Sequence, residues 1–153
     1  MASDRLLERI ETILAAESSR AAKAGSIAEA IRDDGGYRWV GLYDVDHKAG
    51  MVMNIGWSGP NAPAFPTFPL TKGLTSGAIA TKKTVNVGDV SSDASYLTAL
   101  DSTRSEIIVP VLDSNGNVVG TIDVESARVN AFDASAQERL EELSQRFASF
   151  WSV

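Results

Sequence analysis

The chain has 153 residues, 44% of them apolar, which is enough for a single globular domain with a full core over residues 1–153. The formal net charge of −6, with no cluster of lysine or arginine, argues against nucleic acid or an anionic membrane as a partner. Because the chain has no cysteine, it cannot supply a thiolate nucleophile, a disulfide, an iron–sulfur ligand or a cysteine-type zinc site.

The N-terminal region, residues 1–34, has the apolar spacing of two amphipathic helices. Ser3 can cap the first helix, and the second ends at Gly35-Gly36, where glycine can adopt a left-handed cap. Charged residues interrupt the first ten positions, and no apolar run reaches about 18 residues, which predicts a cytoplasmic protein without a signal peptide or membrane span. The apolar stripe of the first helix consists of Leu6, Leu7, Ile10, Ile13 and Leu14.

Two strands follow, joined by the polar turn at residues 46–50. Residues 37–45, YRWVGLYDV, alternate so that Trp39 and Tyr43 lie on the same face of the first strand. Residues 51–57, MVMNIGW, form its antiparallel partner. His47, the only histidine, lies in the turn and is interpreted as a solvated loop residue, because no second histidine and no cysteine accompanies it as a metal ligand.

Residues 58–69, SGPNAPAFPTFP, carry four of the five prolines, which excludes a helix or a central strand and predicts a stiff loop. Phe65 and Phe68 on this loop either form the wall of a pocket or fasten the loop to the core. Beyond it, we expect a short helix from Leu74 to the Lys82-Lys83 pair and a strand over residues 84–87. A polar, turn-rich segment follows, with a short helix around Tyr96–Leu100.

Residues 104–126, RSEIIVPVLDSNGNVVGTIDVES, predict a β-hairpin. The Asn115-Gly116 pair between two β-forming runs favours a type I′ turn, in which both central residues have positive φ. A turn centred on this pair places Ile108 opposite Asp123 and Glu106 opposite Glu125. A C-terminal helix over residues 133–153 ends the chain, with Asp133 as its cap. Its apolar stripe, Leu140, Leu143, Phe147 and Trp151, could pair with that of the N-terminal helix.

The hairpin register puts Glu106, Asp123 and Glu125 on the same face of the sheet. At about 7 Å and an effective dielectric of about 20, each pair of these acids repels by about 2 kcal/mol, so a proton or a positive charge should lie nearby. The alternative is that this face is open to solvent, where the acids cost little. Positive charge could come from the ammonium, guanidinium or metal ion of a ligand, or from Arg104, Lys72, Lys82 and Lys83.

The order of elements indicates an α+β fold with a central antiparallel sheet. Helices, including both terminal helices, should pack on one face of the sheet, and a ligand pocket should occupy the other.

Several segments together resemble a GAF domain. They are WVGLYDV, KGLTSGA, VNVGDV, STRSEIIVPV, and GTIDVES followed by FDASAQERLEEL, and the similarity covers residues 20–148. They are most similar to the small stand-alone members related to free methionine-(R)-sulfoxide reductase, because SEIIVP and GTIDVES occur in that branch in this order. The resemblance implies a sheet of five or six strands that carries a small-molecule site opposite its helices.

In that branch, methionine sulfoxide is bound by an aromatic wall and an acidic cluster. The resemblance assigns the wall to Trp39 and Tyr43 and the acidic cluster to Glu106, Asp123 and Glu125, with Glu125 in place of the usual aspartate. The three cysteines of the reductases correspond to Phe65, Thr75 and Ala99. Sulfoxide reduction by a thiol needs an attacking thiolate and a resolving thiol, so this chain cannot follow the mechanism of the family.

Three functions remain open at this point. The first is a sensor domain that binds a small cationic or zwitterionic ligand, such as an amino acid derivative, and signals through its terminal helices. The second is an enzyme in which one of the three acids acts as a general acid or base. The third is an interaction module that has lost its ligand. For the protein as a whole we expect a homodimer through the terminal helices, and we assign it no metal, cofactor or catalytic residue.

Overall fold

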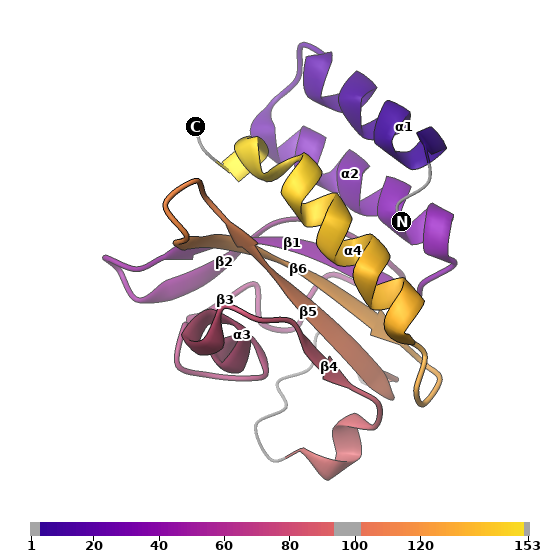
Figure 1. Ribbon diagram of the computed structural model, residues 1–153, viewed down its shortest axis with the longest axis vertical. Coiled ribbons are helices and arrows are strands. Elements are labelled where there is room, and N and C mark those ends of the chain that lie inside the picture. The colour runs from indigo at the N-terminus through magenta and orange to yellow at the C-terminus, as the bar shows by residue number, and fades with distance from the viewer. Residues whose placement is uncertain (1–3, 94–101, 152–153) are drawn as a thin grey trace.

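The computed structural model describes residues 4–93 and 102–151, whose centre is a six-stranded antiparallel sheet in the order β3-β2-β1-β6-β5-β4 (Figure 1). This confirms the predicted α+β fold with five or six strands. The strands that face each other across the middle of the sheet, β1, β5 and β6, carry the acids and aromatic residues selected from the sequence. The strand bounds are β1 Trp39–Asp46, β2 Met51–Ser58, β3 Thr67–Pro69, β4 Val85–Val87, β5 Ser105–Leu112 and β6 Val118–Ser126.

Helices α2 and α4 lie on one face of the sheet, and α1 packs mainly on α2, further from the sheet (Figure 1). Helix α3 lies on the opposite face, where Leu74 and Ala78 contact Ile108 of β5. Among the described helices, none is long and apolar enough to cross a membrane. The bounds are α1 Asp4–Ala15, α2 Arg20–Gly35, α3 Thr75–Thr81 and α4 Ala134–Arg146, with short 3-10 helices η1 Val90–Ser92 and η2 Ala148–Trp151.

Helix α2 begins and ends as its sequence predicts. The Ser19 hydroxyl accepts a hydrogen bond from the Ala22 amide at 3.1 Å, and Gly36 adopts a left-handed cap with φ of 65°. On its sheet side, α2 comes so close to β2 that a Cβ atom at Gly56 would lie 2.4 Å from the backbone nitrogen of Gly25. The predicted Ser3 cap of α1 lies outside the described residues, as does the predicted helix at Tyr96–Leu100.

The β5–β6 hairpin has the predicted register but not the predicted turn. Only Gly116 has positive φ, 79°, and its amide donates to the Asp113 carbonyl at 3.0 Å, so the type I′ assignment is wrong. The Asp113 carboxylate accepts hydrogen bonds from the amides of Asn115 and Asn117, which favours this longer turn. A register shift between Val111 and Leu112 then restores the predicted pairing, because the extra residue of the bulge compensates for the longer turn.

The predicted helix over residues 133–153 is shorter in the structure. Asp133 caps it by accepting from the Ala136 amide at 2.8 Å, but α4 ends at Arg146 and the chain continues as η2. The tighter turn lets Phe150 and Trp151 enter the core, where the Trp151 indole donates to the Tyr43 carbonyl at 3.0 Å. Burial of these aromatic residues and this hydrogen bond favour the change of helix type over continued α-helix.

The proline-rich loop returns to the sheet as the short edge strand β3, in agreement with the exclusion of a central strand. Phe68 is buried and its ring lies 5.8 Å from that of Tyr43 in an edge-on arrangement, so it fastens the loop to the core. Phe65 is 45% exposed.

Candidate functional site

The acid cluster, which we define as the carboxylates of Glu106, Asp123 and Glu125, forms at the centre of the sheet. Glu106 on β5 pairs with Glu125 on β6, and Asp123 lies two residues before Glu125 on the same face. On the other side of β6, Trp39 of β1 pairs with Glu125. The predicted register is confirmed, and the three acids share one face.

The acid cluster is buried. Glu106 is 2% exposed, Asp123 is 7% exposed and Glu125 is fully covered, and one oxygen of each carboxylate lies within 4.8 Å of the others. The alternative that this face is open to solvent is therefore wrong. Carboxylates in this position carry a large desolvation cost that a solvated strand end would not impose.

No basic side chain of the described residues forms an ion pair with Glu106 or Asp123. Glu106 Oε1 and Asp123 Oδ1 are buried and have no hydrogen-bond partner within the described ranges. The four basic residues considered from the sequence, Arg104, Lys72, Lys82 and Lys83, are all exposed. Within the described part of the chain, nothing positive offsets these two acids.

Burial and mutual repulsion change the protonation of the cluster. Burial, followed by the charge of Asp123, raises the pKa of Glu106 well above its usual value. Burial also raises the pKa of Asp123 from 3.8 to about 6, while a hydrogen bond with Glu106 acts in the opposite direction. We interpret these directions as a Glu106 carboxyl group that keeps its proton and donates it in a hydrogen bond to the Asp123 carboxylate.

Tyr43 adds a neutral phenol beside the acids. Burial is the main cause that raises its pKa well above 10, and the charges of Asp123, Glu125 and Glu106 raise it further. The side chain of Asn54 on β2 lowers it. The phenol therefore keeps its proton at physiological pH and can donate a hydrogen bond.

Trp39 forms a fixed aromatic wall. Its indole is fully buried and donates a hydrogen bond to the Asn61 carbonyl at 3.0 Å, which ties the proline-rich loop to β1. A Cβ atom at Gly41 or Gly59 would lie 2.3 Å from the indole ring, so only glycine lets the ring occupy this position. The loop and the strand thus hold Trp39 in one orientation.

Two hydroxyl groups near the acids were not selected from the sequence. The Thr103 hydroxyl donates to the Glu125 carboxylate, and Thr121 shares the face of Asp123 with a buried hydroxyl that has no partner among the described residues. The period of two that joins Thr121 to Asp123 and Glu125 was available as a signal. Thr103 precedes β5 and has no such pattern, so only the fold reveals it.

The remaining sequence-selected residues lie elsewhere. Phe65 is exposed on the proline-rich loop, and Thr75 is buried at the start of α3. No hydrogen bond or ring contact given for the described residues joins either of them to the acid cluster. Ala99, the third position that corresponds to a reductase cysteine, lies outside the described residues. The structure therefore brings together five of the seven selected residues: Trp39, Tyr43, Glu106, Asp123 and Glu125.

This arrangement can perform two kinds of chemistry. Buried carboxylate oxygens can accept hydrogen bonds from an ammonium or guanidinium group, and the same oxygens are the ligands that a hard divalent cation prefers. The Glu106–Asp123 pair can also hold and transfer a proton. With no cysteine in the chain, thiol chemistry at this site is excluded.

Comparison with known proteins relates the chain to one family. The GAF domain model matches residues 18–151. The GAF domain-containing protein A of Dictyostelium discoideum is 29% identical over 140 residues, which cover 92% of this chain and 86% of that protein. The solved structure of free methionine-R-sulfoxide reductase from Neisseria meningitidis, in complex with its substrate, is 30% identical with a TM-score of 0.83 and covers 99% of this chain and 93% of that one. The type II enzyme of that name from Thermoplasma acidophilum is 28% identical with a TM-score of 0.76, over 95% of this chain and 94% of its own.

Proposed function

The chain belongs to the GAF domain family, whose fold is a small-molecule-binding sensor fold, and we propose that it binds a small cationic or zwitterionic ligand, such as an amino acid derivative, at the acid cluster. The observation that carries this proposal is the burial of Glu106 and Asp123 without any basic partner in the described ranges. A ligand ammonium or guanidinium group would supply the missing charge and hydrogen-bond donors.

The aromatic side chains support the same class of ligand. Trp39 and Tyr43 lie on the strand beside Asp123 and Glu125, and ring faces attract a cationic group or cover the aliphatic part of an amino acid. Phe65 and Thr75, two of the positions at which the reductases have cysteine, are included in the proposed ligand site as an apolar and a hydroxyl group. Their contact with a ligand is part of the proposal.

Binding rather than thiol reduction is proposed because of the side chains present. The Neisseria and Thermoplasma proteins are named free methionine-R-sulfoxide reductases, but the present chain has no cysteine to attack a sulfoxide or to resolve the product. The acids can still recognise the ammonium group of such a compound, because this recognition needs only carboxylate oxygens.

A thermal-shift and calorimetric screen tests the proposal with methionine sulfoxide, methionine, arginine, lysine and methylammonium as probes. A probe at about 100 times its dissociation constant should stabilise the fold by about 2.7 kcal/mol. Glu106→Gln should weaken the binding at least about tenfold, since it removes one negative charge from the cluster. Asp113→Asn, which removes a charge from the exposed hairpin turn, is the matched control and should bind as the wild type does. If no amine or guanidinium compound stabilises the protein, the proposal is wrong.

Acid–base catalysis is a second candidate, favoured by the raised pKa of the buried Asp123, which reaches about 6. A carboxyl group that titrates near neutrality can exchange a proton with a bound substrate. An NMR titration of the labelled carboxyl groups tests the premise. A cluster in which every acid ionises near its usual pKa would exclude this candidate.

We also propose, from the sequence, a cytoplasmic protein that dimerises through its terminal helices and signals through them. Leu7, Ile13 and Leu14 on α1 are only partly buried, which leaves apolar surface for a second copy. Light scattering of the wild type and of Leu14→Glu tests this, because the variant should be a monomer if α1 forms the interface. A fluorescent fusion would test the location.

A further inference from the structure

A second feature of the fold lies at the β4 edge of the sheet, away from the acid cluster. Strand β4 pairs only with residues Glu106–Ile108 of β5, whereas β5 continues to Leu112. Among the described strands, none covers the outer side of residues 109–112. Near this free edge, the segment of Lys82–Thr84 leads from α3 into β4, and Lys82 has the left-handed conformation, φ 59°, that ends α3.

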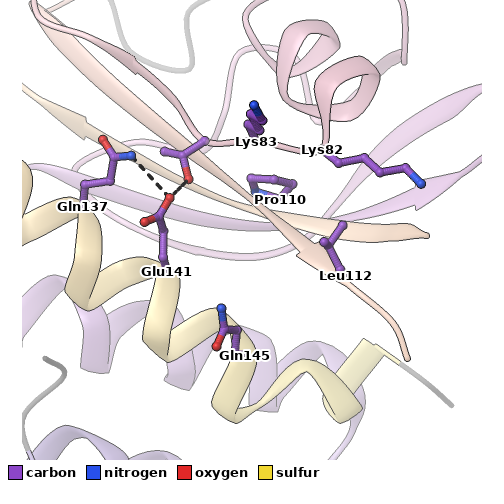
Figure 2. A pocket seen from close by; sticks show the side chains of 8 residues that line it. Lys82, Lys83, Pro110, Leu112, Gln137, Glu141 and Gln145 are labelled. Atoms are coloured by element: carbon purple, nitrogen blue, oxygen red, sulfur yellow. Dashed lines mark hydrogen bonds between the residues drawn. The ribbon is translucent and has the colours of Figure 1, made fainter. Parts of the chain in front are cut away.

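A cleft of about 480 Å³ lies between this edge, the Lys82–Thr84 segment and helix α4 (Figure 2). Gln137, Glu141 and Gln145 line the α4 side at a spacing of four residues, which places them on the same face of the helix. Figure 2 shows Lys82 and Lys83 on the opposite side, with β5 between them and the helix.

The backbone of β5 offers hydrogen-bonding groups to this cleft. The Asp113 amide donates to the Asn117 carbonyl across the hairpin, so the backbone groups of Asp113 point toward β6. Because these groups alternate along a strand, those of Leu112 and Pro110 point toward the free edge. Leu112 therefore presents both an N–H and a carbonyl, and Pro110 presents a carbonyl without an N–H, as is usual for proline at an edge.

The charge of the cleft is positive, although the chain as a whole has a net charge of −6. Lys82 and Lys83 are exposed and have no ion pair with any described residue. Glu141 is the one acid of the lining, and its Oε2 accepts hydrogen bonds from Thr84 at 2.5 Å and Gln137 at 3.3 Å. The glutamate thus helps to join α4 to the segment before β4, and the two lysines keep their charge for a partner.

We propose that this cleft binds an extended segment of a partner protein that carries acidic side chains and adds to the free edge of β5. Residues 109–112 extend over about 13 Å, which accommodates about four residues of an added strand. One side of the segment would place its acids toward Lys82 and Lys83, and apolar side chains would cover the exposed Leu112. The inference is independent of the ligand proposed at the acid cluster.

The experiment uses the full chain, labelled for amide NMR, and an acetylated and amidated heptapeptide of alternating valine and glutamate. The peptide should shift the amide resonances of Leu112, Lys82, Lys83 and α4, with the Leu112 amide becoming protected from exchange. The same peptide with lysine in place of glutamate should bind at least about tenfold more weakly, because its charge is repelled.

Three variants separate the contributions. The double variant Lys82→Gln/Lys83→Gln should weaken binding about tenfold, and Lys48→Gln/Lys72→Gln, which removes two exposed charges elsewhere, should not. Leu112→Pro removes the N–H of the edge and should abolish binding, whereas Leu112→Ala keeps it and should reduce affinity by no more than about threefold. If Leu112→Pro fails to fold, the lysine pair still decides the question.

Several outcomes would overturn the inference. They are no binding of the acidic peptide at millimolar concentration, equal binding of the lysine peptide, and equal loss in the two lysine double variants. A dimer of the free chain that Leu112→Pro converts to a monomer would show that a second copy, rather than an acidic partner, occupies the cleft.

Discussion

Replacing Asp123 by asparagine should change how the stability of the protein depends on pH. In the folded protein, burial raises the pKa of Asp123 from 3.8 to about 6. As the pH rises above 3.8 the unfolded chain ionises first, so the folded state loses stability until the pH passes about 6. At 1.36 kcal/mol per pKa unit, the full loss is about 3 kcal/mol. An asparagine at this position cannot ionise, so the variant escapes this loss.

The expected result follows from this sign. Between about pH 4 and about pH 8, the free energy of unfolding of Asp123→Asn should rise by about 2 to 3 kcal/mol relative to the wild type. Glu106 acts in the same direction, because the charge of Asp123 contributes to its raised pKa and is absent in the variant. Urea denaturation followed by circular dichroism at each pH measures the difference.

A control of opposite sign is available in the same hairpin. Hydrogen bonds led by the Asn117 amide lower the pKa of the exposed Asp113, so that carboxylate stabilises the fold above its usual pKa and loses this effect as the pH falls. Asp113→Asn should therefore become less stable relative to the wild type as the pH rises. If Asp123→Asn and the wild type have the same pH dependence, within about 0.5 kcal/mol, the acid cluster ionises normally and the reasoning about its burial is wrong.

Three further substitutions test the packing. Gly56→Ala should cost about 1 to 3 kcal/mol in urea denaturation, because its Cβ would lie 2.4 Å from the backbone of α2, whereas Gly25→Ala meets no atom within 4 Å and should stabilise the helix by about 0.5 to 1 kcal/mol. Trp151→Phe should cost at least about 1 to 3 kcal/mol in thermal unfolding, since it leaves the buried Tyr43 carbonyl without its donor; an unchanged midpoint would contradict this role. Asp133→Ala should cost about 1 kcal/mol by loss of the α4 cap, measured by helix content and urea midpoint, and Asp133→Ser should recover most of it.

The positions of most elements could be predicted because they depend on local chemistry. The break between α1 and α2 lies at Ser19, which caps α2, and proline confines the loop before β3 to the sheet edge. The hairpin shows the limit of such reasoning. The Asn115-Gly116 pair located the turn, but the Asp113 carboxylate selected a longer turn type, and a bulge before Leu112 restored the register.

The C-terminal helix shows a similar limit. Its apolar stripe was readable through Trp151, but the helix ends at Arg146 because Trp151 finds its hydrogen-bond acceptor on Tyr43, a residue far away in sequence. No spacing within the helix contains this information. The same is true of Thr103, whose hydroxyl meets Glu125 only because the two strands lie side by side.

The sequence by itself determined that Glu106, Asp123 and Glu125 share a face and that no thiol chemistry is possible, because side-chain alternation and residue identity are local properties. Only the tertiary structure decided that this face is buried and that the lysines considered as partners are directed elsewhere. The physical reason is that the cost of a charge depends on the solvent and the charges around it, and elements distant in sequence supply both.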